Sequence, residues 1–327
     1  MHSVYLGPGK RLLDFLLGEP KKKKCRKDVK LNSALKMELD RRTKMIKGDI
    51  PDEFPRKMRE TSKYHQFKAV EHKFMLQNAG PIVFKKIMHG DLYKHFMLSI
   101  MGCRLLSGRN VEAHVAQVRG LFLEFVQKAP SLYGQEFVSI LVHCLIHICD
   151  DVERYGLNLT ELSAFEFESY LGFISSLLRS PTHLVVQYCN RMEEAELYRI
   201  DPEENATQEM TILMRTKTAV QKIKYKGMIL GDSHPNSTVL LANKTVAEIQ
   251  RFEYEGADLF VVVKKFKKTA FLDSKWDPDI FNNWEVTCSS QDEWTVPLNT
   301  IVLKFVRFQM NYSKDESKRL FVVPLLL

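Results

Sequence analysis

The spacing of apolar residues changes near residue 200, and this change limits the folds open to the chain more than any other feature. Between residues 61 and 198 apolar side chains recur every three or four positions, as in Phe67, Val70 and Phe74, which is the period of an amphipathic helix. After about residue 200 the apolar segments are short, β-branched or aromatic and partly alternating, as in DLFVVVKKF and TIVLKFVRFQM. The sequence therefore predicts an α+β protein: a mainly helical body followed by a small β-barrel-like domain of about six short strands.

Four segments follow from this change and from the distribution of charge. We expect a basic N-terminal segment at residues 1–60, a helical domain at 61–198, a linker at 199–216 and a β-rich domain at 217–327. The linker is placed where an acidic, polar stretch beginning at Asp201 interrupts both patterns. Within the helical domain we expect Pro130 to end a helix of about 111–128, because proline continues a helix poorly, and another helix to cover about 135–154.

Length and composition place the chain among globular proteins. Its 327 residues, 45% of them hydrophobic, are enough for one large or two ordinary domains. No apolar run approaches the ~18 residues of a membrane helix, and charges interrupt residues 1–20, where a signal peptide would be apolar. The six cysteines are scattered without a CxxC motif, as is usual in a reducing compartment. We expect an intracellular protein, nuclear or otherwise cytoplasmic, with no membrane partner.

The net charge of +8 is concentrated at one end of the chain. Residues 1–60 contain 17 Lys and Arg against 9 Asp and Glu, whereas the two signs balance in the remainder. A run of like charges attracts polyanions, so we predict DNA binding or a nuclear-import signal here, with a solvated loop as the alternative. The residues of this run are Lys21, Lys22, Lys23, Lys24, Arg26 and Lys27.

The segment SAFEFESYLGF, residues 163–173, places Glu166 and Glu168 inside an apolar and aromatic stretch. On a helix, Glu168 would border the apolar face, with the small residues Gly172 and Ser175 four and seven positions further on. Such a carboxylate can point into a cleft, although most glutamates at positions of this kind are surface groups. Glu166 lies in the first helical turn, where the helix dipole favours a negative charge. Glu168 is therefore the candidate for chemistry.

The segment LVHCLIHICDDVERYG offers a second candidate site. His143 and His147 are four residues apart, and Asp150, Asp151 and Arg154 extend the same helical stripe. This spacing can present two imidazoles and a carboxylate to one metal ion, and we predict the set His143, His147 and Asp151. The glutamate of the HExxH pattern is absent, so the general base of a zinc protease is missing. The alternative is a pair of core histidines bonded to backbone or carboxylate groups, which is the more common role.

Several blocks, taken in order over nearly the whole chain, resemble one family. The blocks are MHSVYLG, IPDEFPRK, HQFKAVEHKFMLQNAGPIVFKKIM, LYKHFMLSIMGCRLL, APSLYGQEFVSILVHCLIHICDDVERYG, SAFEFESYLGFISSLLRSP and FVVPLLL. They are similar to the C-terminal part of transposase-domain proteins of invertebrate genomes, which are related to the transposases of CACTA (En/Spm-like) DNA transposons. The patterns H-x-x-x-H-x-x-D-D-V and S-A-F-x-F-E-x-Y-L-G are so specific that a chance match does not explain the resemblance.

The resemblance implies an RNase H-like nuclease whose Asp-Asp-Glu set cuts and joins DNA with two divalent cations, Mg²⁺ or Mn²⁺. By motif, the family's glutamate corresponds to Glu168, and Met1-His2 to the end of its D-x-M-H motif, while Glu166 stands where the family usually has proline. Both aspartates would then lie upstream of Met1, and residues of about 10–150 would form the family's helical insertion. Glu168 and His2 are expected to be catalytic remnants. The chain alone is expected not to cut DNA, because one carboxylate cannot hold two cations.

Three functions remain open at this point. The leading hypothesis is a transposon-derived protein, catalytically incomplete, that binds DNA non-specifically through the basic segment and needs no cofactor. The second is a fragment of an active DDE-type transposase, dependent on Mg²⁺ or Mn²⁺, whose aspartates are supplied from upstream of Met1 or by a transposase partner. The third is a chromatin or protein interaction module in the β-rich domain. A homo-oligomer is compatible with each of them.

Overall fold

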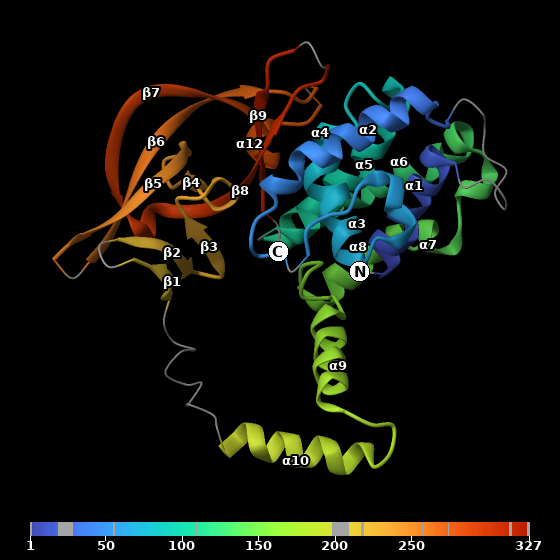
Figure 1. Cartoon of the computed structure of the whole chain (residues 1–327). Helices are drawn as coiled ribbons and strands as arrows, with labels where there is room; N and C mark the ends of the chain where they lie inside the picture. Colours follow the sequence, from blue (N-terminus) through green and yellow to red (C-terminus); the bar gives the residue numbers. More distant parts are fainter. Residues whose placement is uncertain are drawn as a thin grey trace.

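The computed structural model describes residues 2–18, 29–54, 56–108, 110–197, 209–216, 219–256, 258–273, 275–313 and 316–325. Helices occupy the first part of the chain and strands the second (Figure 1). This order confirms the predicted α+β architecture, a mainly helical body followed by a barrel-like antiparallel sheet. No helix within these ranges combines the length and the apolar content that crossing a lipid bilayer requires.

The helical elements vary from single turns to five-turn helices, and η marks the short 3₁₀ and π helices. They are η1 (His2–Gly9), α1 (Lys10–Leu17), α2 (Ser33–Met45), η2 (Ile46–Asp49), η3 (Thr61–Gln66), α3 (Ala69–Lys73), η4 (Phe74–Ala79), α4 (Gly80–Val83), α5 (Gly90–Ser107), η5 (Val111–His114), α6 (Val115–Tyr133), η6 (Gln135–Phe137), α7 (Ile140–His143), α8 (Leu145–Tyr155), α9 (Phe165–Leu177) and α10 (Leu184–Leu197).

The centre of the helical body is the close packing of α5 against α6. Phe122 of α6 lies over Gly102 of α5, where an added Cβ atom would come within 2.4 Å of the ring. Only glycine therefore permits this approach. Phe96 and Met101 of α5 and Phe125 of α6 are fully buried beside this contact, so the two helices supply much of the core.

Two helix boundaries differ from the sequence-based expectation. α6 does not end at Pro130 but continues through it to Tyr133, and Gly134, with φ of 101°, ends the helix. Proline removes only one hydrogen bond here, and burial of Ala129 and Tyr133 in the core outweighs that loss. The single helix expected at 135–154 is instead divided into η6, α7 and α8, with a break at Cys144 between α7 and α8.

The strands form a three-stranded sheet and a closed antiparallel barrel. The barrel order is β4-β5-β6-β7-β9-β8, and β8 pairs back onto β4, with Val239 opposite Lys304. The strands are β1 (Met210–Arg215), β2 (Val220–Tyr225), β3 (Met228–Gly231), β4 (Thr238–Leu241), β5 (Val246–Glu255), β6 (Asp258–Ala270), β7 (Trp284–Pro297), β8 (Ile301–Met310) and β9 (Arg319–Pro324), with the short helices η7 (His234–Asn236), α12 (Pro278–Phe281) and η8 (Leu298–Thr300) between them. β1, which pairs with β2, lies inside the segment expected to be a linker.

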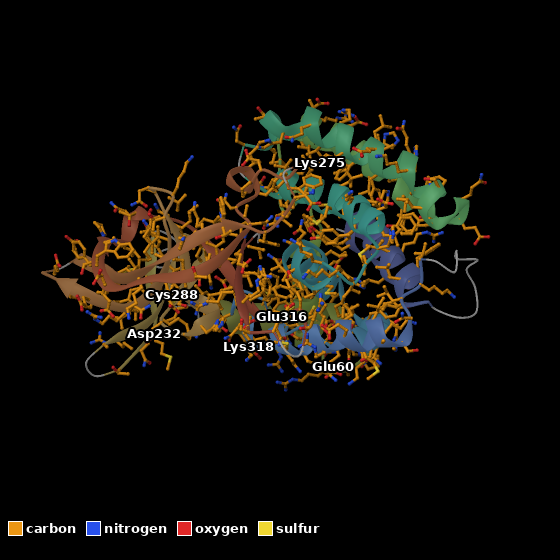
Figure 2. The ribbon with its side chains drawn as sticks, turned by 90° about the horizontal axis from the view of Figure 1, so that it is seen from above. Glu60, Asp232, Lys275, Cys288, Glu316 and Lys318 are labelled. Atoms are coloured by element: carbon orange, nitrogen blue, oxygen red, sulfur yellow. The ribbon has the colours of Figure 1, made fainter. Side chains whose placement is uncertain are left out.

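One apolar core joins the helical body to the barrel. It contains residues from η1 and α1 near the start of the chain and from β8 and β9 near its end, so the core crosses residue 60 without a break. Phe74 and Phe308 meet edge to face across this boundary, with ring centroids 5.9 Å apart. Lys275, which follows β6 and is labelled in Figure 2, pairs with Glu124 of α6 at 3.5 Å. The two parts therefore pack as one body.

A cluster of buried polar groups, the Lys304 seam, also lies at this boundary. Lys304 of β8 is 1% exposed, and its ammonium contacts the Glu53 carboxylate at 2.8 and 2.9 Å. It also donates to Asn236 Oδ1 at 2.8 Å and to the Ile229 carbonyl oxygen. We define the Lys304 seam by these four residues. Every donor of the ammonium is thus paired with an acceptor from another segment.

Helices α9 and α10 form an arm that projects from the rest of the molecule (Figure 1). Its two helices touch through a hydrogen bond between the Tyr170 and Tyr188 hydroxyls, 3.0 Å long. Phe167 of α9 is 73% exposed, and other apolar side chains of the arm share this exposure. They are Tyr170, Leu171, Phe173, Leu184, Val185, Val186 and Leu197. The arm thus presents an apolar surface that the described part of the chain does not cover.

Candidate functional sites

Glu168 lies on α9, in the projecting arm. Its backbone N–H donates to the Ala164 carbonyl at 2.9 Å, and its side chain is exposed. Gly172, one turn further on, has open space where a Cβ atom would stand. The small residues beside Glu168 therefore border solvent rather than a cleft. The glutamate does lie on a helix, as the sequence indicates, and its catalytic role stays a prediction.

Two groups of predicted site residues fall wholly or partly outside the described residues. His2 begins η1 on the helical body, but its side chain and that of Glu166 are not described. The basic run Lys21, Lys22, Lys23, Lys24, Arg26 and Lys27 lies in residues 19–28, which are not described either. The prediction of DNA binding by this run therefore rests on the sequence.

His143 and His147 are brought together at the break between α7 and α8. Their Nε2 atoms are 3.3 Å apart, and Nδ1 of His147 lies 3.2 Å from the Asp150 carboxylate. If Asp150 accepts the Nδ1 proton, Nε2 of His147 keeps its lone pair for a ligand. Two nitrogens bound to one tetrahedral zinc ion would be separated by about 3.3 Å, since each Zn–N bond is about 2.0–2.1 Å. The imidazole pair therefore has a spacing compatible with a metal ion.

The carboxylate that contacts this pair is Asp150, which lies on the predicted stripe, whereas the predicted ligand set contained Asp151. Arg119 of α6 binds Asp150 and also Glu153, the latter at 2.7 Å, so Asp150 is held by a cation as well as by His147. The contacts that Asp150 makes with Arg119 and with His147 keep the pKa of its carboxyl below the usual value. Across the described ranges, no group of three or more His, Cys, Asp or Glu side chains is arranged to hold a metal ion. A metal at His143, His147 and Asp151 stays a prediction.

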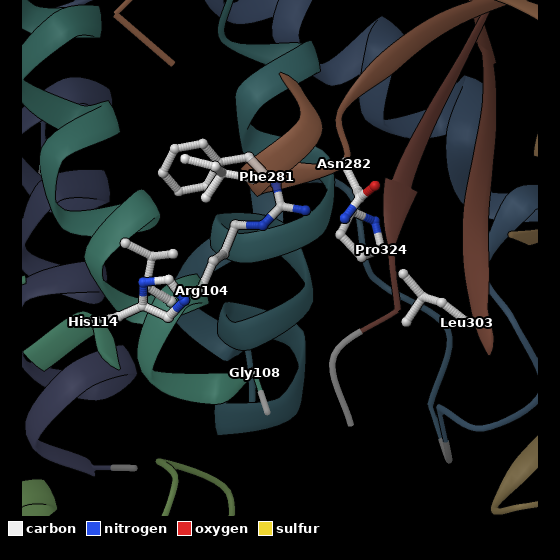
Figure 3. A pocket seen from close by; sticks show the side chains of 9 residues that line it. Arg104, Gly108, His114, Phe281, Asn282, Leu303 and Pro324 are labelled. Carbon is white, nitrogen blue, oxygen red and sulfur yellow. The ribbon is translucent and has the colours of Figure 1, made fainter. Parts of the chain in front are cut away.

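A pocket that no sequence pattern indicates lies at the boundary between the helical body and the barrel (Figure 3). The pocket has a volume of about 220 Å³, and we call it the Arg104 pocket. Arg104 reaches from α5 toward Phe281 and Asn282, with His114 of η5 beside its stem. Leu303 of β8 and Pro324 of β9 line the barrel side. Residues more than 200 positions apart in the sequence thus form one concave site.

The guanidinium of Arg104 is buried with few partners. Nη1 donates to Asn283 Oδ1 at 2.7 Å, whereas Nη2 has no hydrogen-bond partner among the described residues. Nδ2 of Asn283 is likewise buried without a partner in the described chain. Burial lowers the pKa of Arg104 to about 9, and the group still carries its charge at neutral pH. One sequence signal was available: Arg104 is a lone cation inside the apolar stretch IMGCRLL.

Comparison of the chain with protein-family models, with curated proteins and with solved structures gave no match.

Proposed function

We propose that this chain is a transposase-derived protein that binds DNA without cutting it. The observation that carries the proposal is the position of Glu168, the residue to which the resemblance assigns catalysis, because its side chain is exposed on the projecting arm. Two-metal cleavage of DNA needs several carboxylates that converge on one point in a shaped site. An exposed side chain on a projecting arm differs from such a site, and this difference supports a non-catalytic role.

DNA affinity is assigned to the basic run, because it holds six cations within residues 21–27. Lysines that contact phosphates release condensed counterions, so affinity falls steeply as salt rises. In the full-length chain, changing Lys21, Lys22, Lys23 and Lys24 to Gln should weaken binding to every duplex alike. It should also reduce the slope of log affinity against log salt by about 3–4. Fluorescence anisotropy with labelled duplexes of two unrelated sequences measures both quantities.

The matched control removes the same charge from exposed lysines elsewhere. Lys47, Lys63, Lys94 and Lys267 are exposed and lie on four different elements or loops. Their joint change to Gln should leave the salt slope nearly unaltered if the basic run makes the phosphate contacts. Equal losses in the two quadruple variants would show that net charge alone attracts DNA, and the assignment to residues 21–27 would then be wrong.

The absence of cleavage is tested separately. Supercoiled plasmid incubated with the purified chain and Mg²⁺ or Mn²⁺ should remain supercoiled, because a single inherited carboxylate cannot position two cations. The control is Glu168→Gln, which removes the charge but keeps the shape of the side chain. Nicking by the unaltered chain that disappears in Glu168→Gln would contradict a non-catalytic role.

A second candidate function is favoured by the apolar surface of the arm. Phe167, Leu171 and Phe173 are exposed on the helix that carries Glu168, and exposed apolar clusters of this kind commonly mark a contact surface. If a nuclease sheet encoded upstream of Met1 packs there, the chain is part of an active DDE-type transposase. A longer polypeptide that includes the upstream-encoded residues should then nick DNA with Mg²⁺, and its Glu168→Gln variant should not. Inactivity of a folded longer polypeptide would remove this candidate.

A further inference from the structure

The Arg104 pocket contains a positive charge that the described protein does not neutralise. Arg104 is 4% exposed, and its burial lowers its pKa, while no carboxylate of the described residues raises it. A buried charge without a counterion is costly, and proteins normally pair such a group or remove it. Its presence therefore calls for a partner that comes from outside the described chain.

The unused donors of the site point to the chemistry of that partner. Nη2 of Arg104 and Nδ2 of Asn283 are both buried donors without acceptors in the described chain, and Nη1 of Arg104 links the two side chains. A cationic N–H donor without an acceptor is best satisfied by an anionic oxygen, such as that of a carboxylate. One guanidinium balances one negative charge, so a monoanion fits better than a dianion.

The backbone of the pocket wall places Asn283 beside Arg104. Asn282 has φ of 50°, in the left-handed region that asparagine tolerates better than most residues. This turn follows α12 directly and leads into β7, so that the fully buried Asn283 comes within hydrogen-bond distance of Arg104. The donor pair is therefore held by the chain geometry of the barrel as well as by α5.

The pocket is open to solvent, and its wall is mixed, because the polar side chains of His114 and Asn282 line it beside apolar ones. Phe281, Leu303 and Pro324 line it, and Ile280 at its edge is 48% exposed. A volume of about 220 Å³ lies below the range of about 300–1,000 Å³ that is usual for pockets of drug-sized ligands. A ligand smaller than a drug is therefore of the right size, with its charged end at Arg104 and its body against the apolar part of the wall.

We propose that the Arg104 pocket binds a small organic monocarboxylate, with its carboxylate at the guanidinium of Arg104 and its aliphatic or aromatic body against Phe281 and Leu303. This site is independent of the DNA-binding proposal, because the buried guanidinium is out of reach of the phosphates of a duplex. Binding links α5 to the segment between α12 and β7, and the ligand therefore joins the helical body to the barrel.

The test compares carboxylates with the amides of the same shape. Benzoate and butyrate are titrated into the full chain, with benzamide and butyramide as neutral counterparts and inorganic phosphate as a second oxyanion. We expect the carboxylates alone to raise the melting temperature with concentration and to show saturation transfer in ligand-observed NMR. Equal effects of benzoate and benzamide would overturn the proposal. A response to phosphate without a response to either carboxylate would overturn it as well.

Variants assign the effect to the pocket. Arg104→Met keeps the length of the side chain but removes the charge, and the dissociation constant for benzoate should rise about tenfold or more. Arg251→Met is the matched control, because Arg251 is an exposed arginine of β5 that pairs with Glu253 and Glu293. Benzoate binding that survives Arg104→Met unchanged would place the ligand elsewhere and contradict the proposal.

Asn283→Asp provides a test that does not depend on removing Arg104. The change is isosteric and places a carboxylate at the atom that already accepts from Nη1 of Arg104, so the protein supplies its own counterion. Benzoate affinity should fall about tenfold while the fold and the unliganded melting temperature are kept or improved. If Asn283→Asp binds benzoate as tightly as the unaltered chain, the guanidinium is not the group that holds the carboxylate.

Discussion

Lys304 and Arg104 are buried cations at the boundary between the helical body and the barrel. They differ in how many acceptors surround their charge. In the Lys304 seam the ammonium has a carboxylate, an amide oxygen and a carbonyl as partners. In the Arg104 pocket one amide oxygen is the only acceptor among the described residues. Complete pairing is typical of a structural role, and incomplete pairing beside a cavity is typical of a binding site.

Arg42 shows that a buried arginine in this protein can be fully paired. It is 2% exposed, and Nε binds Glu38 at 2.8 Å. Nη1 donates to the carbonyls of Val83 and Lys85, and Nη2 donates to that of Tyr312. The few partners of Arg104 are therefore not shared by every buried arginine among the described residues.

The largest expected effect comes from breaking the Lys304 seam. Lys304→Met leaves the Glu53 carboxylate buried without its cation and should lower the free energy of unfolding by about 3–5 kcal/mol. Urea denaturation of the single variant measures this loss. The double variant that also carries Glu53→Gln removes the unpaired carboxylate, and it should recover a large part of the lost free energy of unfolding. A loss of the same size in both variants would mean that packing, not charge pairing, gives the seam its stability.

A smaller effect is expected from Asp49, which lies beside the seam and accepts the Gln309 N–H at 2.9 Å. Burial raises the pKa of Asp49 to about 6 from 3.8, so the folded protein binds this proton more readily than the unfolded chain. The stabilisation is present below about pH 4 and is lost as pH rises toward 6. It amounts to about 3 kcal/mol.

The Asp49→Asn variant isolates this contribution. Other groups titrate in the same window, so the free energy of unfolding is measured for both proteins from pH 4 to pH 7 and only their difference is compared. The variant should gain stability relative to the unaltered chain as pH rises through this window. Parallel curves for the two proteins would show that the pKa of Asp49 is close to that of an exposed aspartate.

Arg104→Met should have the opposite sign to Lys304→Met when no ligand is added. Removing a buried charge that lacks a counterion should raise the free energy of unfolding by about 1–2 kcal/mol, because a binding residue is often kept at a cost in stability. Thermal and urea denaturation measure this gain. A clear destabilisation would show that Arg104 is needed for the fold, and the contrast with Lys304 would then disappear.

The smallest effect is expected at the surface, where Arg119 makes two ion pairs with Asp150 and Glu153. Exposed pairs gain little because water screens the charges and the side chains lose freedom. Arg119→Met should therefore leave the melting temperature unchanged within error. A large drop in the melting temperature would show that the number of charged contacts, and not their burial, determines how much they stabilise this protein.

The sequence predicts those parts of the fold in which one face of each helix or strand is buried. The change of period near residue 200 predicted the helical body and the barrel, because burial imposes a spacing of three to four on helices and of two on strands. β1 was missed, since MTILMR is a single short strand in a stretch that otherwise reads as polar. The continuation of α6 through Pro130 depends on the burial of Tyr133, which local spacing does not encode.

The candidate sites were harder to predict, because they depend on residues that are far apart in the sequence. His143 and His147 are four residues apart, so their meeting could be predicted from spacing, but the support from Asp150 depends on Arg119 of another helix. Arg104 meets Asn283 across 179 positions of the sequence. The Arg104 pocket is distinguished by a buried N–H donor that has no acceptor among the described residues. No local sequence pattern shows which donors remain unpaired after folding.

The order of strands around the barrel also bears on how the protein is made. β9, residues 319–324, lies between β7 and β8, so the ring closes only after this strand has been inserted. During synthesis the helical body can collapse while the sheet still has two unpaired edges, on β7 and β8. Contacts between strands distant in sequence form slowly, and open edges attract other chains. Until β9 pairs with both neighbours, the sheet therefore keeps two edges that can pair with other chains.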